Sequence, residues 1–232
     1  MTPLLVLLLV LLVCAHAERK TERKIYHEGG AIRKADGSKA EDSPWYYHGL
    51  DGPSFTNYTV SGLEIREYPA QLWVSVDVEG TQFDVAQNKG FDILFDYISG
   101  ENEGSVTIDM TTPVLTFVQP GDGPNCASLF TVSFYVPYQY QTAEGPPKPT
   151  NEDVYVNSIG PLTVAVDEFS GYALEPEILS RTAKLSTTVE NADGLSMDKT
   201  EEFVDKWWEA GYDPPFRVTN RHNEVWVPVI VE

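Results

Sequence analysis

The chain has 232 residues, with 35 aspartates and glutamates against 16 lysines and arginines, and a formal net charge of −19 at pH 7. An acidic protein of this kind repels nucleic acid and anionic membrane surfaces, so we expect neither as a partner. The length suits one large domain or two small ones with a buried core, and two cysteines are too few for a disulfide scaffold.

The N-terminus has the features of a secretory signal peptide. Residues 4–13 are all apolar, but this run is too short to cross a bilayer, which takes about 20 residues. Small residues follow at Ala15 and Ala17, the pattern of a cleavage site. We therefore expect a signal peptide over residues 1–17 and a secreted protein. The alternative interpretation is an N-terminal membrane anchor.

A basic arm follows over residues 18–43. Seven of the 16 lysines and arginines lie between residues 18 and 40, and large apolar residues are scarce there, so we expect this arm to be disordered. The folded domain is expected over residues 44–232. No segment of that domain is apolar enough to span a membrane.

Two positions are candidates for covalent modification. The sequence Asn57-Tyr58-Thr59 is a glycosylation sequon, and in a secreted chain we expect a glycan on Asn57. Cys14 leaves with the signal peptide, so Cys126 stands alone in a loop rich in glycine and proline. It is either a small buried side chain, a disulfide link to a partner chain or a reactive thiol. No histidine lies near it in the sequence, which argues against a catalytic thiol.

The domain begins with two strands and a helix. Polar and apolar residues alternate over residues 63–66 and 71–79, which predicts two half-buried strands that are separated at Tyr68-Pro69. A helix is then expected over about 82–99, because polar residues at 84, 88, 92 and 96 form a stripe opposite an apolar face.

The sequence also predicts how this helix begins, packs and ends. Thr81 and Asp84 resemble a capping box at its start, and Gly100 is a typical residue at its end. Gly90 costs about 1 kcal/mol relative to alanine in a helix, so we expect it to allow a close backbone approach to a sheet or a ligand.

The second half repeats this order. Alternating residues predict strands at 130–134, 162–169 and 225–229, a proline-rich linker at 144–150 and a helix at 176–190 that begins with Pro176. Trp207 and Trp208 should project to opposite faces of a strand, so that one of them stays accessible. The expected fold is α+β, in which a duplicated β-α-β unit with pseudo-two-fold symmetry forms a curved sheet or a distorted β-barrel flanked by two long helices.

Motifs for catalysis or metal binding are missing from the sequence. It contains no Cys-x-x-Cys, no two histidines at helical spacing, no nucleophile elbow and no phosphate-binding loop. We therefore expect no enzyme and no structural zinc site. Five tryptophans favour, weakly, a groove for an apolar ligand.

Nine short segments in register carry a family resemblance over residues 44–231. They include LEIREYPAQLWVSV at 63–76, MTTPV at 110–114, VSFYVP at 132–137, AGYDPP at 210–215 and RHNEVWV at 221–227. In this order the segments resemble the SOUL family of heme-binding proteins. The resemblance implies a pseudo-two-fold, barrel-like sheet with two long helices and a shallow hydrophobic groove for heme or another tetrapyrrole.

Carried over residue by residue, the resemblance implies a ligand site at Met110, Tyr212, Phe216 and Arg217. Met110 is a soft side chain that suits packing on a porphyrin ring, and Tyr212 and Phe216 are suited to lining the groove. Arg217 is suited to a bidentate bond with a propionate arm of the ligand, and the alternative is a surface ion pair.

One position departs from the family pattern. Some members carry a histidine, proposed as an axial iron ligand, where this chain has Glu67 in Arg66-Glu67-Tyr68. We therefore expect non-covalent heme or porphyrin binding without an assigned axial ligand, although His48 and His222 remain in the domain. The leading alternative is a secreted interaction module of the same fold that has lost tetrapyrrole binding.

Overall fold

The computed structural model describes residues 43–123 and 126–232. The expected signal peptide, and the basic arm up to residue 42, lie outside the described residues. The secondary-structure elements in chain order are η1 (Trp45–Tyr47), β1 (Thr56–Val60), β2 (Leu63–Tyr68), β3 (Gln71–Gly80), α2 (Phe83–Ser99), β4 (Val114–Gln119), β5 (Ser128–Tyr135), η2 (Tyr138–Tyr140), β6 (Val154–Ile159), β7 (Leu162–Phe169), α3 (Glu175–Glu190), β8 (Leu195–Met197), β9 (Trp207–Gly211) and β10 (Asn223–Val231).

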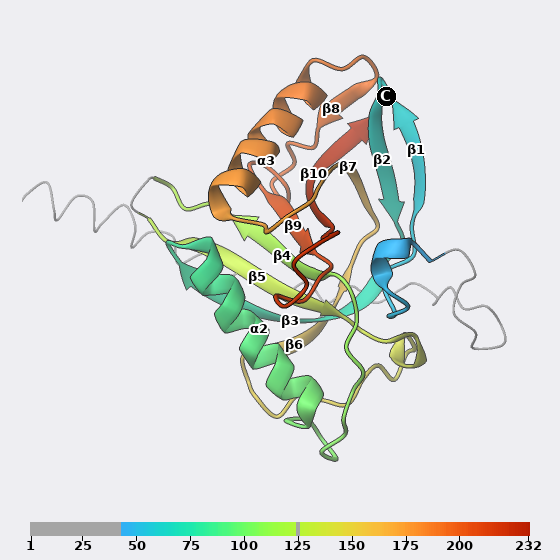
Figure 1. Ribbon diagram of the computed structural model, residues 1–232, viewed down its shortest axis with the longest axis vertical. Helices are drawn as coiled ribbons and strands as arrows, with labels where there is room; N and C mark the ends of the chain where they lie inside the picture. Colours follow the sequence, from blue (N-terminus) through green and yellow to red (C-terminus); the bar gives the residue numbers. More distant parts are fainter. Residues whose placement is uncertain (1–42, 124–125) are drawn as a thin grey trace, which may run out of the picture.

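The strands form one large antiparallel sheet with two helices packed on it (Figure 1). The strand order is β1-β2-β7-β10-β9-β4-β5-β3-β6, and β8 pairs with β10 beside this path. The α+β class and the two long helices are therefore confirmed. The path is open, with β1 and β6 at its two ends, so the distorted β-barrel that the sequence suggested is not confirmed.

Both faces of the sheet are covered, and each face has its own core. Helix α2 packs against β3 and β5, and α3 packs against β7, β8 and β10. We call the core under the helices the helix-face core, and the aromatic core on the other side the opposite-face core. Trp207 belongs to the first and Trp208 to the second, as alternation along a strand requires. Both are at most 8 % exposed, so the prediction that one stays accessible is wrong.

The helices lie close to their predicted positions. Helix α2 ends at Ser99 and is followed by the C-cap residue Gly100, whose φ of 129° suits glycine. Its N-cap residue is Gln82, and no capping hydrogen bond from Thr81 or Asp84 is present, so the predicted capping box is wrong. A Cβ on Gly90 would lie 2.5 Å from Cγ2 of Val132 in β5, which confirms the predicted close approach to the sheet.

Helix α3 begins at Glu175, one residue before the predicted start, and Pro176 lies in its first turn. Among the described residues, no helix has the length and apolar character that a membrane crossing needs. Cys126 is half-buried in the loop before β5, and its amide donates to the carbonyl of Gly123. A disulfide-linked partner through Cys126 stays a prediction.

Candidate functional site

The loop that joins β9 to β10, residues 212–222, is organised by Asp213. The side chain of Asp213 is fully buried and accepts three hydrogen bonds: from the amide of His222 at 2.6 Å, from Nη1 of Arg217 at 3.0 Å and from Nε2 of His48 at 2.9 Å. Burial opposes ionisation of Asp213, but these donors outweigh it and hold the pKa of the carboxyl below its usual range. A charged carboxylate therefore anchors the loop.

Arg217 and His48 lie side by side on this carboxylate. Nη1 of Arg217 is 3.0 Å from Nδ1 and 2.7 Å from Nε2 of His48. Since a carboxylate only accepts, Nε2 of His48 carries the proton in its contact with Asp213. Both side chains reach the surface, with 38 % of Arg217 and 25 % of His48 exposed.

Arg221 braces the same loop from inside. Its guanidinium donates to four backbone carbonyls, at Gly171, Asp213, Pro214 and Arg217, at 2.6–3.1 Å. The side chain is only 9 % exposed, so Arg221 fixes the loop and is not presented to a ligand.

Apolar side chains stand out from the loop and from the segment before α3. Phe216 is 84 % and Val218 72 % exposed, while Tyr172 and Leu174 are half exposed or more. The hydroxyl of Tyr172 donates to the carbonyl of Pro215, which joins the two segments. We call these four residues the loop patch. Large apolar side chains this exposed are typical of a ligand or partner site.

A buried ion-pair network lies beneath the loop. Glu224 of β10 is fully buried and accepts from Nη1 of Arg66 at 2.9 Å, from the Tyr212 hydroxyl at 2.7 Å and from the Trp226 indole at 2.7 Å. Nε2 of His222 lies 2.7 Å from the same carboxylate. Burial opposes the charge on Glu224, but His222, Arg66 and Tyr212 outweigh it and keep the pKa low.

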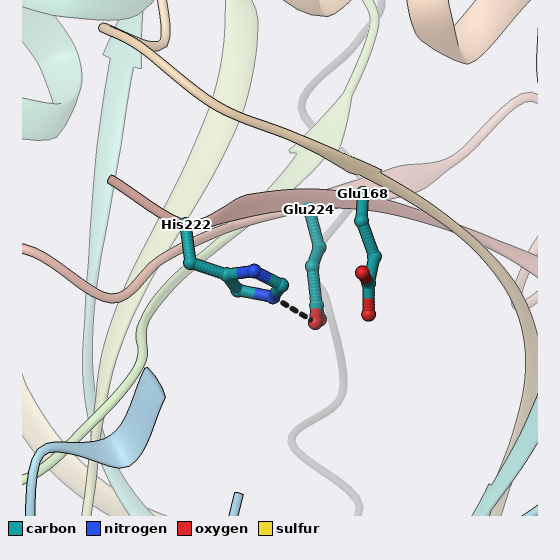
Figure 2. Close-up of side chains that lie close together, drawn as sticks. All are labelled: Glu168, His222 and Glu224. Atoms are coloured by element: carbon teal, nitrogen blue, oxygen red, sulfur yellow. Dashed lines mark hydrogen bonds and ion pairs between the residues drawn. The ribbon is translucent and has the colours of Figure 1, made fainter. Parts of the chain in front are cut away.

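Glu168, His222 and Glu224 form a cluster that resembles a metal site (Figure 2). One ligand atom from each lies within 4.8 Å of the others. However, Arg66 already pairs with Glu224, and its Nη2 lies 3.1 Å from Glu168. A metal ion would have to displace this guanidinium, so we interpret the cluster as an ion-pair network in which Arg66 is the cation.

The structure separates the four ligand-site residues that the sequence suggested. Phe216 and Arg217 lie together at the surface. Tyr212 is buried in the opposite-face core, where its hydroxyl supports Glu224, and Met110 packs on the helix-face core.

Sequence reasoning assigned Arg217 to the site but not Asp213 or its contact with His48. Asp213 contacts His48, which lies 165 residues earlier in the sequence, and no local sequence pattern predicts such a contact. Trp45, 66 % exposed, lies with its ring centroid 6.2 Å from that of His48.

The chemistry of this surface fits a flat apolar ligand with acid arms. The exposed aromatic side chains Trp45 and Phe216 provide contact area, and Arg217 is a cation for a carboxylate. The two described histidines are engaged: His222 pairs with Glu224 and stacks on Tyr46 at 3.8 Å, and His48 pairs with Asp213.

A hollow lies between the end of α3 and β8. Its volume is about 640 Å³, with an apolar floor of Leu195, Met197 and Ile230 and with Lys199 at its edge. Lys199 forms an exposed ion pair with Glu190 at 3.2 Å. This hollow offers another location for an apolar ligand with an acid arm.

Known proteins resemble this chain over most of its length. The family model described as SOUL heme-binding protein matches residues 50–228. Heme-binding protein 2 of Homo sapiens is 34% identical over 198 residues, which cover 85% of this chain and 90% of that protein. Heme-binding protein 1 of Xenopus laevis is 32% identical over 164 residues, covering 71% of this chain and 82% of the relative.

One solved structure supports the fold. The crystal structure of the EcmrR C-terminal domain superposes with a TM-score of 0.54, and the match covers 77% of this chain and 99% of that domain. At 14% sequence identity, this likeness supports the fold alone.

Proposed function

The chain belongs to the SOUL heme-binding protein family, and from this premise we propose that it is a secreted protein that binds heme or a related tetrapyrrole non-covalently and carries or buffers it. Family membership, with 34% identity to human heme-binding protein 2 over 198 residues, is the observation that carries the proposal. In this proposal the protein binds its ligand and does not turn it over.

We place the tetrapyrrole on the loop patch. Phe216 and its exposed neighbours contact the macrocycle, and Arg217 pairs with a propionate arm. Burying about 400 Å² of apolar surface at ~25 cal/mol per Å² contributes roughly 10 kcal/mol. Lost rigid-body freedom offsets about 4 kcal/mol, which leaves about 6 kcal/mol and an affinity on the order of tens of micromolar.

A hemin titration of the mature protein tests the function. We expect a saturable shift of the Soret band, and comparable affinity for a metal-free porphyrin, because contact area contributes most of the binding. An unchanged spectrum at tens of micromolar hemin would reject tetrapyrrole binding and leave the alternative of an interaction module.

A pair of charge-reversal variants tests where on the protein the ligand binds. Arg217→Glu should weaken hemin binding about tenfold, since a propionate would then face a carboxylate. Lys199→Glu makes the same change of charge at the hollow beside α3 and should leave the affinity unchanged. The reverse result would move the ligand to that hollow.

The finer expectations from the sequence remain part of the proposal. Secretion rests on the signal peptide, and N-terminal sequencing of the exported protein should begin at Glu18. Asn57 is exposed on β1, which suits glycosylation. A duplicated origin is supported by the strand order. The strands form four counterpart pairs: β2 with β6, β3 with β7, β4 with β9 and β5 with β10. If each strand is replaced by its counterpart, the order from β2 to β6 is the same when read in the reverse direction, as two-fold symmetry requires.

A further inference from the structure

The guanidinium of Arg217 is held by one end only. Its Nη1 contacts both Asp213 and His48, at 2.7–3.0 Å. Among residues 43–123 and 126–232, Nε and Nη2 of Arg217 form no hydrogen bond or ion pair. An arginine that is anchored at Nη1 presents its Nε–Nη2 edge as a ready pair of parallel donors, which matches the geometry of a carboxylate.

The other arginines of the described chain lack this property. All three guanidinium nitrogens of Arg66 form ion pairs, with Glu64, Glu168 and Glu224. Arg181 is paired with two acidic side chains on and beside α3. Arg221 binds backbone carbonyls and is buried. Arg217 is therefore the arginine whose fork remains available to a ligand.

We propose that Asp213 and His48 are positioning residues, which hold Arg217 so that its Nε–Nη2 edge binds a carboxylate arm of the ligand. The site would then select tetrapyrroles with free acid arms over their neutral esters. This inference rests on the proposed tetrapyrrole-binding function and adds the ligand class and the residues that determine it.

The physical reason is the cost of ordering. A free arginine side chain loses conformational freedom when a ligand fixes it, and that loss weakens binding. Here the buried carboxylate of Asp213 and the ring of His48 have already fixed the guanidinium before the ligand arrives. In a domain with so few cations, one well-oriented arginine is the feature that distinguishes an acid arm from an ester.

An Asp213 variant can separate two explanations for binding of the acid arm, namely attraction by charge alone and positioning of Arg217, because they predict changes of opposite sign. Removing the negative charge in Asp213→Asn should tighten the binding of an anionic ligand if charge alone matters. If positioning matters, the same variant should weaken that binding, because the guanidinium is released. The sign of the change therefore separates the two explanations.

The experiment measures quenching of tryptophan fluorescence by protoporphyrin IX and by its dimethyl ester. For the unmodified protein we expect about tenfold tighter binding of the acid than of the ester. Asp213→Asn should remove most of this preference while the affinity for the ester stays within about twofold. His48→Ala, at a partly exposed position, should have a smaller effect in the same direction and serves as a second variant if Asp213→Asn does not fold.

Each result decides a separate question. Equal affinity for acid and ester in the unmodified protein overturns the acid-arm inference and leaves tetrapyrrole binding intact. A preference for the acid that survives in both variants overturns the positioning role. Binding of neither porphyrin overturns the proposed function itself. His27→Ala, which removes a histidine of the N-terminal arm, is the matched control and should change neither affinity.

Discussion

Replacing Glu209 with glutamine should remove a pH-dependent loss of stability. Glu209 lies in β9 on the helix face of the sheet and is fully buried. Its Oε2 accepts a hydrogen bond of 2.7 Å from Nε2 of Gln87 in α2. Burial raises the pKa of this carboxyl from 4.5 to about 8, although Gln87 and Arg221 oppose the change.

The size and the sign of the effect follow from linkage. Between pH 4.5 and 8 the folded protein keeps a proton on Glu209 that the unfolded chain releases, so stability falls as the pH rises through this range. One pKa unit corresponds to about 1.4 kcal/mol, so the full loss is about 4 to 5 kcal/mol. Glutamine keeps the shape and the hydrogen bond but does not titrate, so Glu209→Gln should escape this loss.

Urea unfolding at pH 5 to 9, followed by tryptophan fluorescence, measures the difference. The free energy of unfolding of Glu209→Gln minus that of the unmodified protein should rise by about 4 kcal/mol over this range. Other titrating groups are shared by both proteins and cancel. Glu152→Gln, at an exposed glutamate, is the control and should give a flat difference. A flat difference for Glu209→Gln as well would refute the reasoning.

Three further predictions concern other buried or modified positions. Glu224→Gln should lower the free energy of unfolding by about 3 kcal/mol, because it leaves the buried charge of Arg66 short of its main partner, and an unchanged urea midpoint would contradict this. Gly90→Ala should destabilise the fold by about 1–3 kcal/mol despite the better helix propensity of alanine, since the new Cβ would meet Val132, and Val132→Ala should relieve the loss. After expression through the secretory pathway, enzymatic deglycosylation should lower the mass of the protein, and Asn57→Gln should show no such change.

Much of the fold could be predicted from local patterns. The helix at Phe83–Ser99 carries an apolar stripe and ends at a glycine, and the strand at Gln71–Gly80 alternates with period two. The distorted barrel is not confirmed, because β1 and β6 lie at the two ends of an open path, and no local pattern encodes whether two such strands meet.

The buried polar residues could not be predicted. Glu209 and Glu224 lie at strand positions where a charged residue usually faces water. At β9 and the first part of β10 both faces of the sheet are covered, by the helix-face core on one side and by the opposite-face core on the other, so these positions are buried. The same covering buries Trp208, which sequence alternation alone left accessible.

The candidate site was predicted only in part. Arg217 and Phe216 were assigned from a family resemblance, and the structure leaves both at the surface. The residues that orient Arg217 come from the start of the domain and from the loop itself, and their contact exists only after the chain has folded.

The central strand pair, β4 with β9, bears on how the molecule assembles. Val114 pairs with Gly211, about a hundred residues later in the chain. This strand pair, which we call the seam, joins β1, β2, β7, β10 and β9 on one side of the sheet to β4, β5, β3 and β6 on the other. Contacts at such separation are entropically expensive to form early, so we expect slow folding in which the seam closes late. During synthesis, the edge of β4 that pairs with β9 would stay unpaired until β9 leaves the ribosome.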